Sequence, residues 1–141
     1  MVFDKELMAE LLKQASVSPR KRQNFDLRNS PADTSQRMLN AMQPGTAVPI
    51  HRHENTAETV VCLQGRLEEV LYEETTSRLQ GDTPAEEEVE PRKTFKEIAR
   101  YLLSPDDGVM GMQIPAGVWH TVNVLEPSVI FEAKDGAYVP R

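Results

Sequence analysis

Hydrophobic residues recur every three or four positions near the start of the chain. Leu7 and Leu11 fall on one face of residues 4–16, and this spacing predicts a short amphipathic helix. Asp4 stands before the first turn and is a residue type that caps helix N-termini. Pro19 predicts that the helix ends before it, because the residue preceding a proline disfavours helical geometry.

From residue 36 onward the pattern changes to short apolar or alternating runs. Runs such as ETVVCLQ and VWHTVNVL are rich in β-branched residues, which favour strands. Pro-Gly and Asp-Gly pairs between the runs predict turns. Several short strands separated by such turns indicate a β-sandwich or barrel. The strands are expected at residues 36–42, 58–64, 66–74, 109–114, 118–125 and 128–133.

Two polar segments interrupt this pattern. Residues 18–36 carry four basic side chains among turn-forming residues, which predicts a solvated loop or, alternatively, arginines that reach into a pocket and hold an anionic group. Residues 73–97 are highly charged and contain two prolines, which predicts a long hairpin excursion or mobile loop. We therefore expect an N-terminal helix with a basic connecting segment over residues 1–24, and a single barrel over residues 25–141.

The composition narrows the classes of partner and compartment. A length of 141 residues suits one domain, and the net charge of −6 disfavours nucleic acid or an anionic membrane as the main partner. The single cysteine, Cys62, excludes an intrachain disulfide and fits a reducing compartment. No signal peptide or run of about 20 apolar residues is evident. We expect a cytoplasmic protein.

The placement of the three histidines carries the candidate chemistry. His51 and His53 are two residues apart and share one face if this segment is a strand. An antiparallel return can then place Glu58 opposite them, and His120 follows a Pro-x-Gly turn into another strand. Any one histidine could instead be an ordinary surface or core residue. Three imidazoles and one carboxylate suit iron, manganese, nickel, cobalt, copper or zinc better than calcium or magnesium. The prediction is one divalent transition metal bound by His51, His53, Glu58 and His120.

The same residues carry a resemblance to the cupin superfamily. Its first motif is matched at every defined position, at Gly45, His51, His53, Glu58 and Gly65. Its second motif is matched at Pro115, Gly117 and His120, whereas Val109 stands where the motif has a glycine and Asn123 lies one residue early. The resemblance implies a mainly β, single-domain cupin barrel (a double-stranded β-helix or jelly roll) and assigns the four predicted ligands to the metal.

A further resemblance covers nearly the whole chain. The segments SPRKRQNFDL, LNAMQPGTAVPIHRH and VIFEAKDGAYVP are similar to the WbuC-type cupin metalloproteins. These small bacterial proteins are often encoded near genes of polysaccharide or O-antigen synthesis, which implies a sugar-related context but no substrate. The resemblance also implies a homodimer. It suggests pocket residues, each of which could instead be an ordinary surface or ion-pair residue: Arg22, Asn24, Arg37, Asn40, Glu132 and Lys134.

Three functions remain open from the sequence. The first is a metal-dependent enzyme, loaded with iron, manganese, nickel or zinc, that acts on a small polar metabolite such as a carbohydrate or nucleotide-sugar derivative. Isomerase, epimerase, lyase or oxygen chemistry would suit such a site. The second is a non-catalytic, metal-dependent sugar-binding or sensor module. In the third, the metal only stabilises the fold.

Overall fold

The computed structural model describes residues 1–77 and 92–139. This part of the chain contains one α-helix, α1 (Lys5–Val17), and a short 3-10 helix, η1 (Pro105–Asp107). Its strands are β1 (Arg22–Asp26), β2 (Ser35–Met42), β3 (Glu58–Gln64), β4 (Leu67–Ser77), β5 (Arg92–Leu103), β6 (Gly111–Ile114), β7 (Trp119–Val124) and β8 (Ser128–Asp135). None of the described helices is both long enough and apolar enough to span a bilayer.

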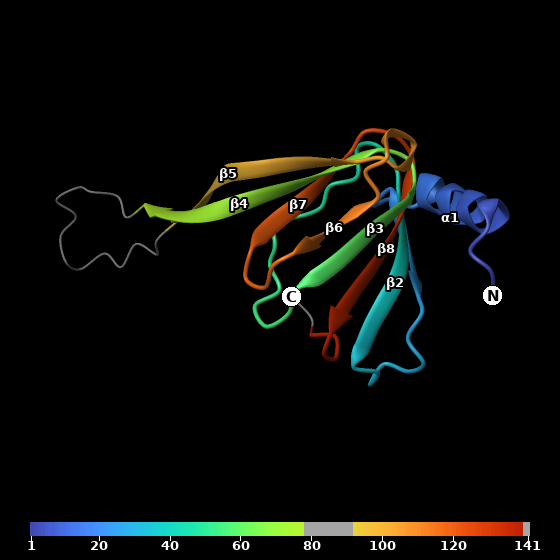
Figure 1. Ribbon diagram of the computed structural model, residues 1–141, viewed down its shortest axis with the longest axis horizontal. Coiled ribbons are helices and arrows are strands. Elements are labelled where there is room, and N and C mark those ends of the chain that lie inside the picture. The colour runs from blue at the N-terminus through green and yellow to red at the C-terminus, as the bar shows by residue number, and fades with distance from the viewer. Residues whose placement is uncertain (78–91, 140–141) are drawn as a thin grey trace.

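The strands form two antiparallel sheets, which confirms the predicted mainly β architecture (Figure 1). The larger sheet has the order β1-β2-β8-β3-β6, and the smaller has the order β5-β4-β7. Inward-facing residues from both sheets make the main hydrophobic core, which includes Met42, Val60, Leu67, Leu103 and Ile130. The ends of β4 and β5 run on past this core as a two-stranded ribbon (Figure 1).

Helix α1 covers part of the outer face of the larger sheet, and the predicted helix is confirmed. The Asp4 side chain accepts a hydrogen bond from the Leu7 backbone N–H at 2.9 Å, which satisfies one free donor of the first turn. The buried face of the helix packs on β2 and β8, where a second apolar cluster forms. That cluster contains Met8, Leu11, Ala15, Leu39, Ala41 and Val129.

Two strands lie where the sequence pattern did not predict them. β1 occupies part of the basic segment for which the sequence predicts a loop, and it crosses the expected boundary after residue 24. β5 begins inside the charged segment 73–97. Both are edge strands that pair with a single neighbour. Backbone hydrogen bonding therefore holds β1 and the charged first half of β5, which lack a regular apolar alternation. The middle of the predicted excursion, residues 78–91, lies outside the described residues.

Candidate metal centre

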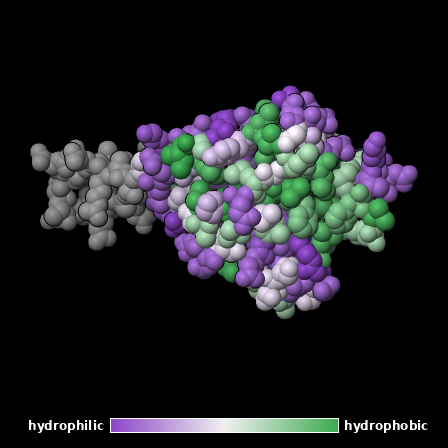
Figure 2. Space-filling model, viewed as in Figure 1, coloured by the Kyte–Doolittle hydropathy of each residue, from purple (hydrophilic) through white to green (hydrophobic). Residues whose placement is uncertain are grey.

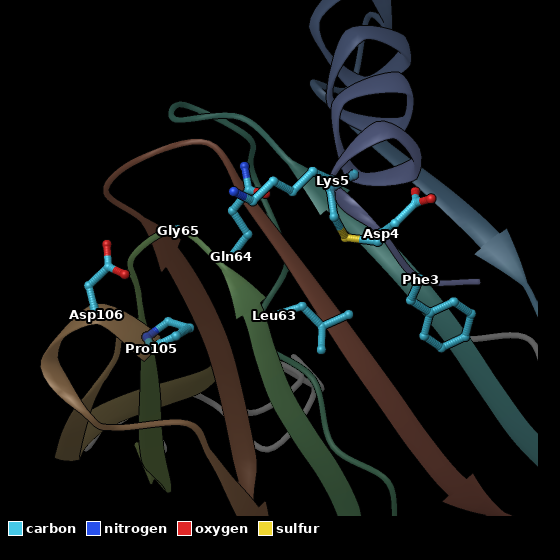
Figure 3. A pocket seen from close by; sticks show the side chains of 9 residues that line it. Phe3, Asp4, Lys5, Leu63, Gln64, Gly65, Pro105 and Asp106 are labelled. Atoms are coloured by element: carbon cyan, nitrogen blue, oxygen red, sulfur yellow. The ribbon is translucent and has the colours of Figure 1, made fainter.

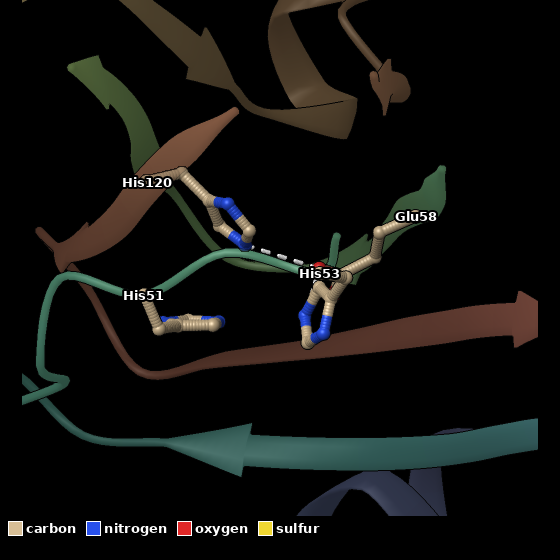
Figure 4. Close-up of side chains that lie close together, drawn as sticks. All are labelled: His51, His53, Glu58 and His120. Atoms are coloured by element: carbon tan, nitrogen blue, oxygen red, sulfur yellow. Dashed lines mark hydrogen bonds and ion pairs between the residues drawn. The ribbon is translucent and has the colours of Figure 1, made fainter. Parts of the chain in front are cut away.

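The four predicted ligands converge in the structure, and they come from both sheets (Figure 4). Glu58 is the first residue of β3 in the larger sheet, and His120 lies on β7 in the smaller sheet. His51 and His53 belong to the segment between β2 and β3. The expectation that these two histidines share a regular strand paired with β3 is wrong, because His51 makes only an isolated bridge to β7 and His53 lies in irregular backbone.

Backbone hydrogen bonds hold this irregular segment against β7. The His51 N–H donates to the His120 carbonyl at 3.0 Å, and the His120 N–H donates to the His51 carbonyl at 2.8 Å. The Gly117 N–H donates to the His53 carbonyl at 2.7 Å. Gly117 has φ +81°, a conformation that glycine adopts readily. The turn before β7 therefore positions all three imidazoles at once.

The potential ligand atoms lie within 4.8 Å of one another. Glu58 Oε2 is 3.1 Å from His120 Nε2 and 3.2 Å from His53 Nε2. Glu58 and His120 are each only 4% exposed, and the His51 and His120 ring centroids are 4.3 Å apart. One ion could therefore contact all four side chains at once.

The hydrogen bonds of the imidazoles select the nitrogen that faces the centre. Nδ1 of His120 lies 3.0 Å from the Val118 carbonyl oxygen, and Nδ1 of His51 lies 2.9 Å from the Pro49 carbonyl oxygen. A carbonyl oxygen only accepts hydrogen bonds, so each Nδ1 carries the proton. Nε2 of His120 therefore faces the Glu58 carboxylate. Two electron-rich atoms at this distance need a proton or a cation between them, and backbone carbonyls behind ligating histidines are typical of metal sites.

Electrostatics keep Glu58 ionised. Burial raises the pKa of its carboxyl, but hydrogen bonds from His120 and His53, together with the charge of Lys134, outweigh burial and lower it overall. A divalent metal would bind the ionised carboxylate and would take the place of the protons through which the imidazoles hydrogen bond to it. The donor set therefore fits the predicted ion.

Five of the six predicted pocket residues lie on the same inward-facing side of the larger sheet. Residues paired across neighbouring strands share a face of the sheet. Lys134 pairs with Glu58, Glu132 with Met38, and Asn40 with Asn24. Because every second residue of a strand lies on the same face as Glu58, the inward side carries Arg22, Asn24, Asn40, Glu132 and Lys134.

Arg37 is not brought to the candidate centre. It alternates with Met38 and shares the outer face of β2 with Leu39, which packs beneath α1. Its guanidinium lies 3.0 Å from the Asp33 carboxylate and donates to the Ser35 carbonyl at 2.7 Å. The structure therefore gives Arg37 a role in holding the loop before β2.

Glu132 is the pocket candidate with the most altered acidity. Burial and the neighbouring negative charge of Glu58 raise the pKa of its carboxyl to about 7, although Lys134 opposes this. A carboxyl with this pKa exchanges protons readily near neutral pH.

Glu69 is an inward-facing carboxyl that the sequence analysis missed. It lies on β4 between Leu67 and Leu71, both part of the core, and is 4% exposed. Burial, and then the charges of Glu58 and Glu132, raise its pKa well above the usual value. The signal was present in the sequence: one charged residue interrupts the apolar positions of an alternating strand.

A separate hollow of about 650 Å³ lies at the other end of β3 (Figure 3). It is bounded by the start of α1, the end of β3 with Gly65, and η1. None of the predicted site residues lines it. This hollow is therefore not part of the candidate metal centre.

Comparison with solved structures shows the fold. KdgF from Halomonas sp. is 20% identical with a TM-score of 0.53, covering 86% of this chain and 85% of that one. TT1209 from Thermus thermophilus is 20% identical with a TM-score of 0.56, covering 96% of each chain. CapF from Staphylococcus aureus, a capsular polysaccharide assembling protein, is 20% identical with a TM-score of 0.56; 88% of this chain matches 30% of CapF. These neighbours are cupin-type proteins, so the predicted cupin fold is confirmed.

Sequence comparison adds a family but no activity. No curated protein matches the chain significantly. The family model described as "Domain of unknown function (DUF6016)" matches residues 3–82, which is more than half of the chain. The protein therefore belongs to the DUF6016 family.

Proposed function

We propose that this protein is a cytoplasmic, metal-dependent cupin enzyme of the WbuC type that acts on a small polar metabolite, such as a carbohydrate or nucleotide-sugar derivative. The observation that carries the proposal is the convergence of His51, His53, Glu58 and His120, whose potential ligand atoms lie within 4.8 Å of one another. CapF, one of the structural neighbours, is a capsular polysaccharide assembling protein, and this supports a sugar-related ligand.

The four ligands would hold one iron, manganese, nickel or zinc ion. Such an ion supplies a Lewis acid that polarises a hydroxyl or carbonyl oxygen of the bound molecule. The protein's own groups would orient that molecule: Lys134 offers a positive charge beside Glu58, and Glu132 can accept or donate a proton near pH 7. Arg22 and Asn24, on the edge strand β1, would contact the end of that molecule that lies farther from the metal.

The test combines metal analysis with a screen for turnover. The protein, purified without chelator or His-tag, is expected to contain close to one equivalent of a transition metal by elemental analysis. Samples loaded with iron, manganese, nickel or zinc are then incubated with sugars and nucleotide sugars, and products are followed by mass spectrometry. We expect one metal to support product formation.

Other outcomes separate the alternatives. Saturable sugar binding without product would replace the enzyme proposal by a binding or sensor module. No binding, together with a melting temperature that falls sharply on metal removal, would leave the metal a structural role. Failure to bind any of the four ions would contradict the central claim.

We also propose a homodimer formed through the outer face of the larger sheet. Helix α1 covers β1, β2 and part of β8, whereas Leu63 on β3 and Met110 before β6 remain 38% and 55% exposed. Hydrophobic residues gather over the β3–β8 region and beside α1 in Figure 2, and contiguous apolar surface is typical of interfaces. Sedimentation equilibrium is expected to give twice the monomer mass, and Leu63→Glu to shift it to monomer. A wild-type monomer would contradict the proposal.

A further inference from the structure

Two buried polar groups on opposite walls of the barrel have no protein partner among the described residues. Asn40 is 9% exposed, and its Oδ1 is enclosed without a hydrogen bond. Glu69 is 4% exposed, and neither a hydrogen bond nor an ion pair to a described residue affects its carboxyl. Leaving such groups unpaired is costly, so each marks a place where a partner from outside the protein belongs.

The strand registers place both groups below the metal ligands. Leu71 pairs with His120, and Glu69 pairs with Val122, so Glu69 lies one inward-facing step deeper than His120. On the larger sheet Lys134 pairs with Glu58, and Glu132 and then Ile130 follow at deeper steps. Asn40 pairs with Ile130 and thus lies two steps below Glu58.

Several inward-facing side chains at this level are only partly buried. Met38, Met112 and Val122 all point inward, yet each keeps part of its surface accessible. Deeper in the barrel the inward-facing residues Met42 and Leu67 are completely buried. A ligand held at the metal centre could therefore extend toward Asn40 and Glu69.

The charges of the site limit the chemistry of that extension. Burial, and then the charges of Glu58 and Glu132, raise the pKa of Glu69. This favours the protonated form of its carboxyl, which can donate one hydrogen bond and accept others. The same carboxyl groups would repel a phosphate or carboxylate placed between them. Asn40 Oδ1 only accepts and needs a donor. A hydroxyl group both donates and accepts, and satisfies all of these requirements.

We propose that Glu69 and Asn40 form a subsite that hydrogen bonds the hydroxyl groups of a polyhydroxylated ligand held at the metal centre. This inference rests on the proposed function, because the metal anchors the other end of the ligand. It narrows the substrate class to a polyol chain, such as that of a sugar or sugar acid. It also assigns recognition of the hydroxyl groups in part to Glu69 on the smaller sheet.

A series of metal-chelating hydroxy acids tests the subsite. Glycolate, glycerate and erythronate share one chelating end and carry zero, one and two further hydroxyl groups. Calorimetric titration of zinc-loaded wild-type protein is expected to show at least about tenfold tighter binding of erythronate than of glycolate, since one good hydrogen bond contributes about that factor. In Glu69→Leu and Asn40→Leu the affinity for glycolate should persist, and the gain along the series should disappear.

The matched control is Glu73→Leu, on an exposed part of the same strand β4, which should keep the wild-type gain. Equal wild-type affinities along the series, or a gain that survives in both variants, would overturn the subsite while leaving the metal proposal intact. Absence of zinc or glycolate binding in the wild type would overturn both.

A second measurement needs no metal. Because Glu69 occupies an apolar position without a partner, metal-free Glu69→Leu should melt at a temperature equal to or above that of the metal-free wild type. Glu69→Gln, which keeps the shape of the side chain, should melt close to the wild type. A clear fall in the melting temperature of both variants would make Glu69 a structural residue and overturn the proposal.

Discussion

Replacing His120 with alanine is expected to reduce bound transition metal from about one equivalent to less than about 0.1. His120 is 4% exposed and directs Nε2 at the Glu58 carboxylate. Removing a residue that hydrogen bonds to a metal ligand typically lowers the affinity for the metal about 10- to 100-fold. Removing the ligand itself should therefore lower that affinity by more than about 100-fold. Elemental analysis after dialysis against metal-free buffer measures the change, and His51→Ala should behave in the same way.

Arg52→Ala is the matched control for these variants, because Arg52 stands between the two histidines of the first motif. Its guanidinium pairs with Glu54 at 3.0 Å and lies 4.6 Å from the centre of the Trp119 ring. The side chain thus points away from the ligand cluster, and this variant should retain its metal. Full metal occupancy in both histidine variants would show that the ion binds elsewhere.

Gly65→Ala is expected to lower the free energy of unfolding by about 3 kcal/mol or more. Gly65 has φ +101°, which strains any residue with a side chain. An added Cβ would also lie 2.7 Å from the Cα of Ser128 and in contact with the Pro127 carbonyl oxygen. Both neighbours include backbone atoms that cannot rotate away. Denaturant unfolding measures the loss.

Gly108→Ala separates the steric cost from the conformational cost. Gly108 also has a positive φ, +77°, but a Cβ there would meet nothing within 4 Å. This variant should lose only about 1 to 2 kcal/mol, the usual cost of a left-handed conformation. Equal losses in the two variants would show that β3 and β8 can separate at Gly65 without difficulty.

The backbone contacts of Gly65 also explain why the first cupin motif ends in glycine here. Gly65 joins β3 to β4, the strands through which the chain passes from the larger sheet to the smaller. At this crossing the backbone runs against the Pro127–Ser128 turn, and the Ser128 hydroxyl accepts from the Arg66 N–H at 3.1 Å. A motif residue that carries no chemistry is therefore required by close backbone packing.

Local patterns in the sequence were sufficient to predict helix α1 and several strands of the fold. The three-and-four spacing after Asp4 predicted α1, and the β-branched run after Glu58 predicted β3 with its observed bounds. Such signals reside in neighbouring residues, because helix caps and apolar periodicity act over a few positions. The donor set of the metal centre also depended only on which residues are present and how they are spaced.

The edge strands and the course of the ligand segment depended on contacts distant in sequence. β1 and β5 are held by pairing with one neighbour each, and apolar residues alternate only at the end of β5, at Ala99, Tyr101 and Leu103. His51 and His53 lie in irregular backbone because hydrogen bonds to His120 and Gly117 hold that segment. A period-two interpretation assigned both histidines to a strand that the structure does not contain.

The sequence by itself determined the chemical character of the site, and the tertiary structure decided its arrangement. Residue types and spacing are sufficient to predict imidazole and carboxylate ligands. Pairing of the sheets then brought Glu58 and His120 together across the barrel, turned Arg37 to the outer face of β2, and set the unpaired carboxyl of Glu69 below the ligands. Which face of a strand looks inward follows from packing between distant segments, and no local pattern contains that information.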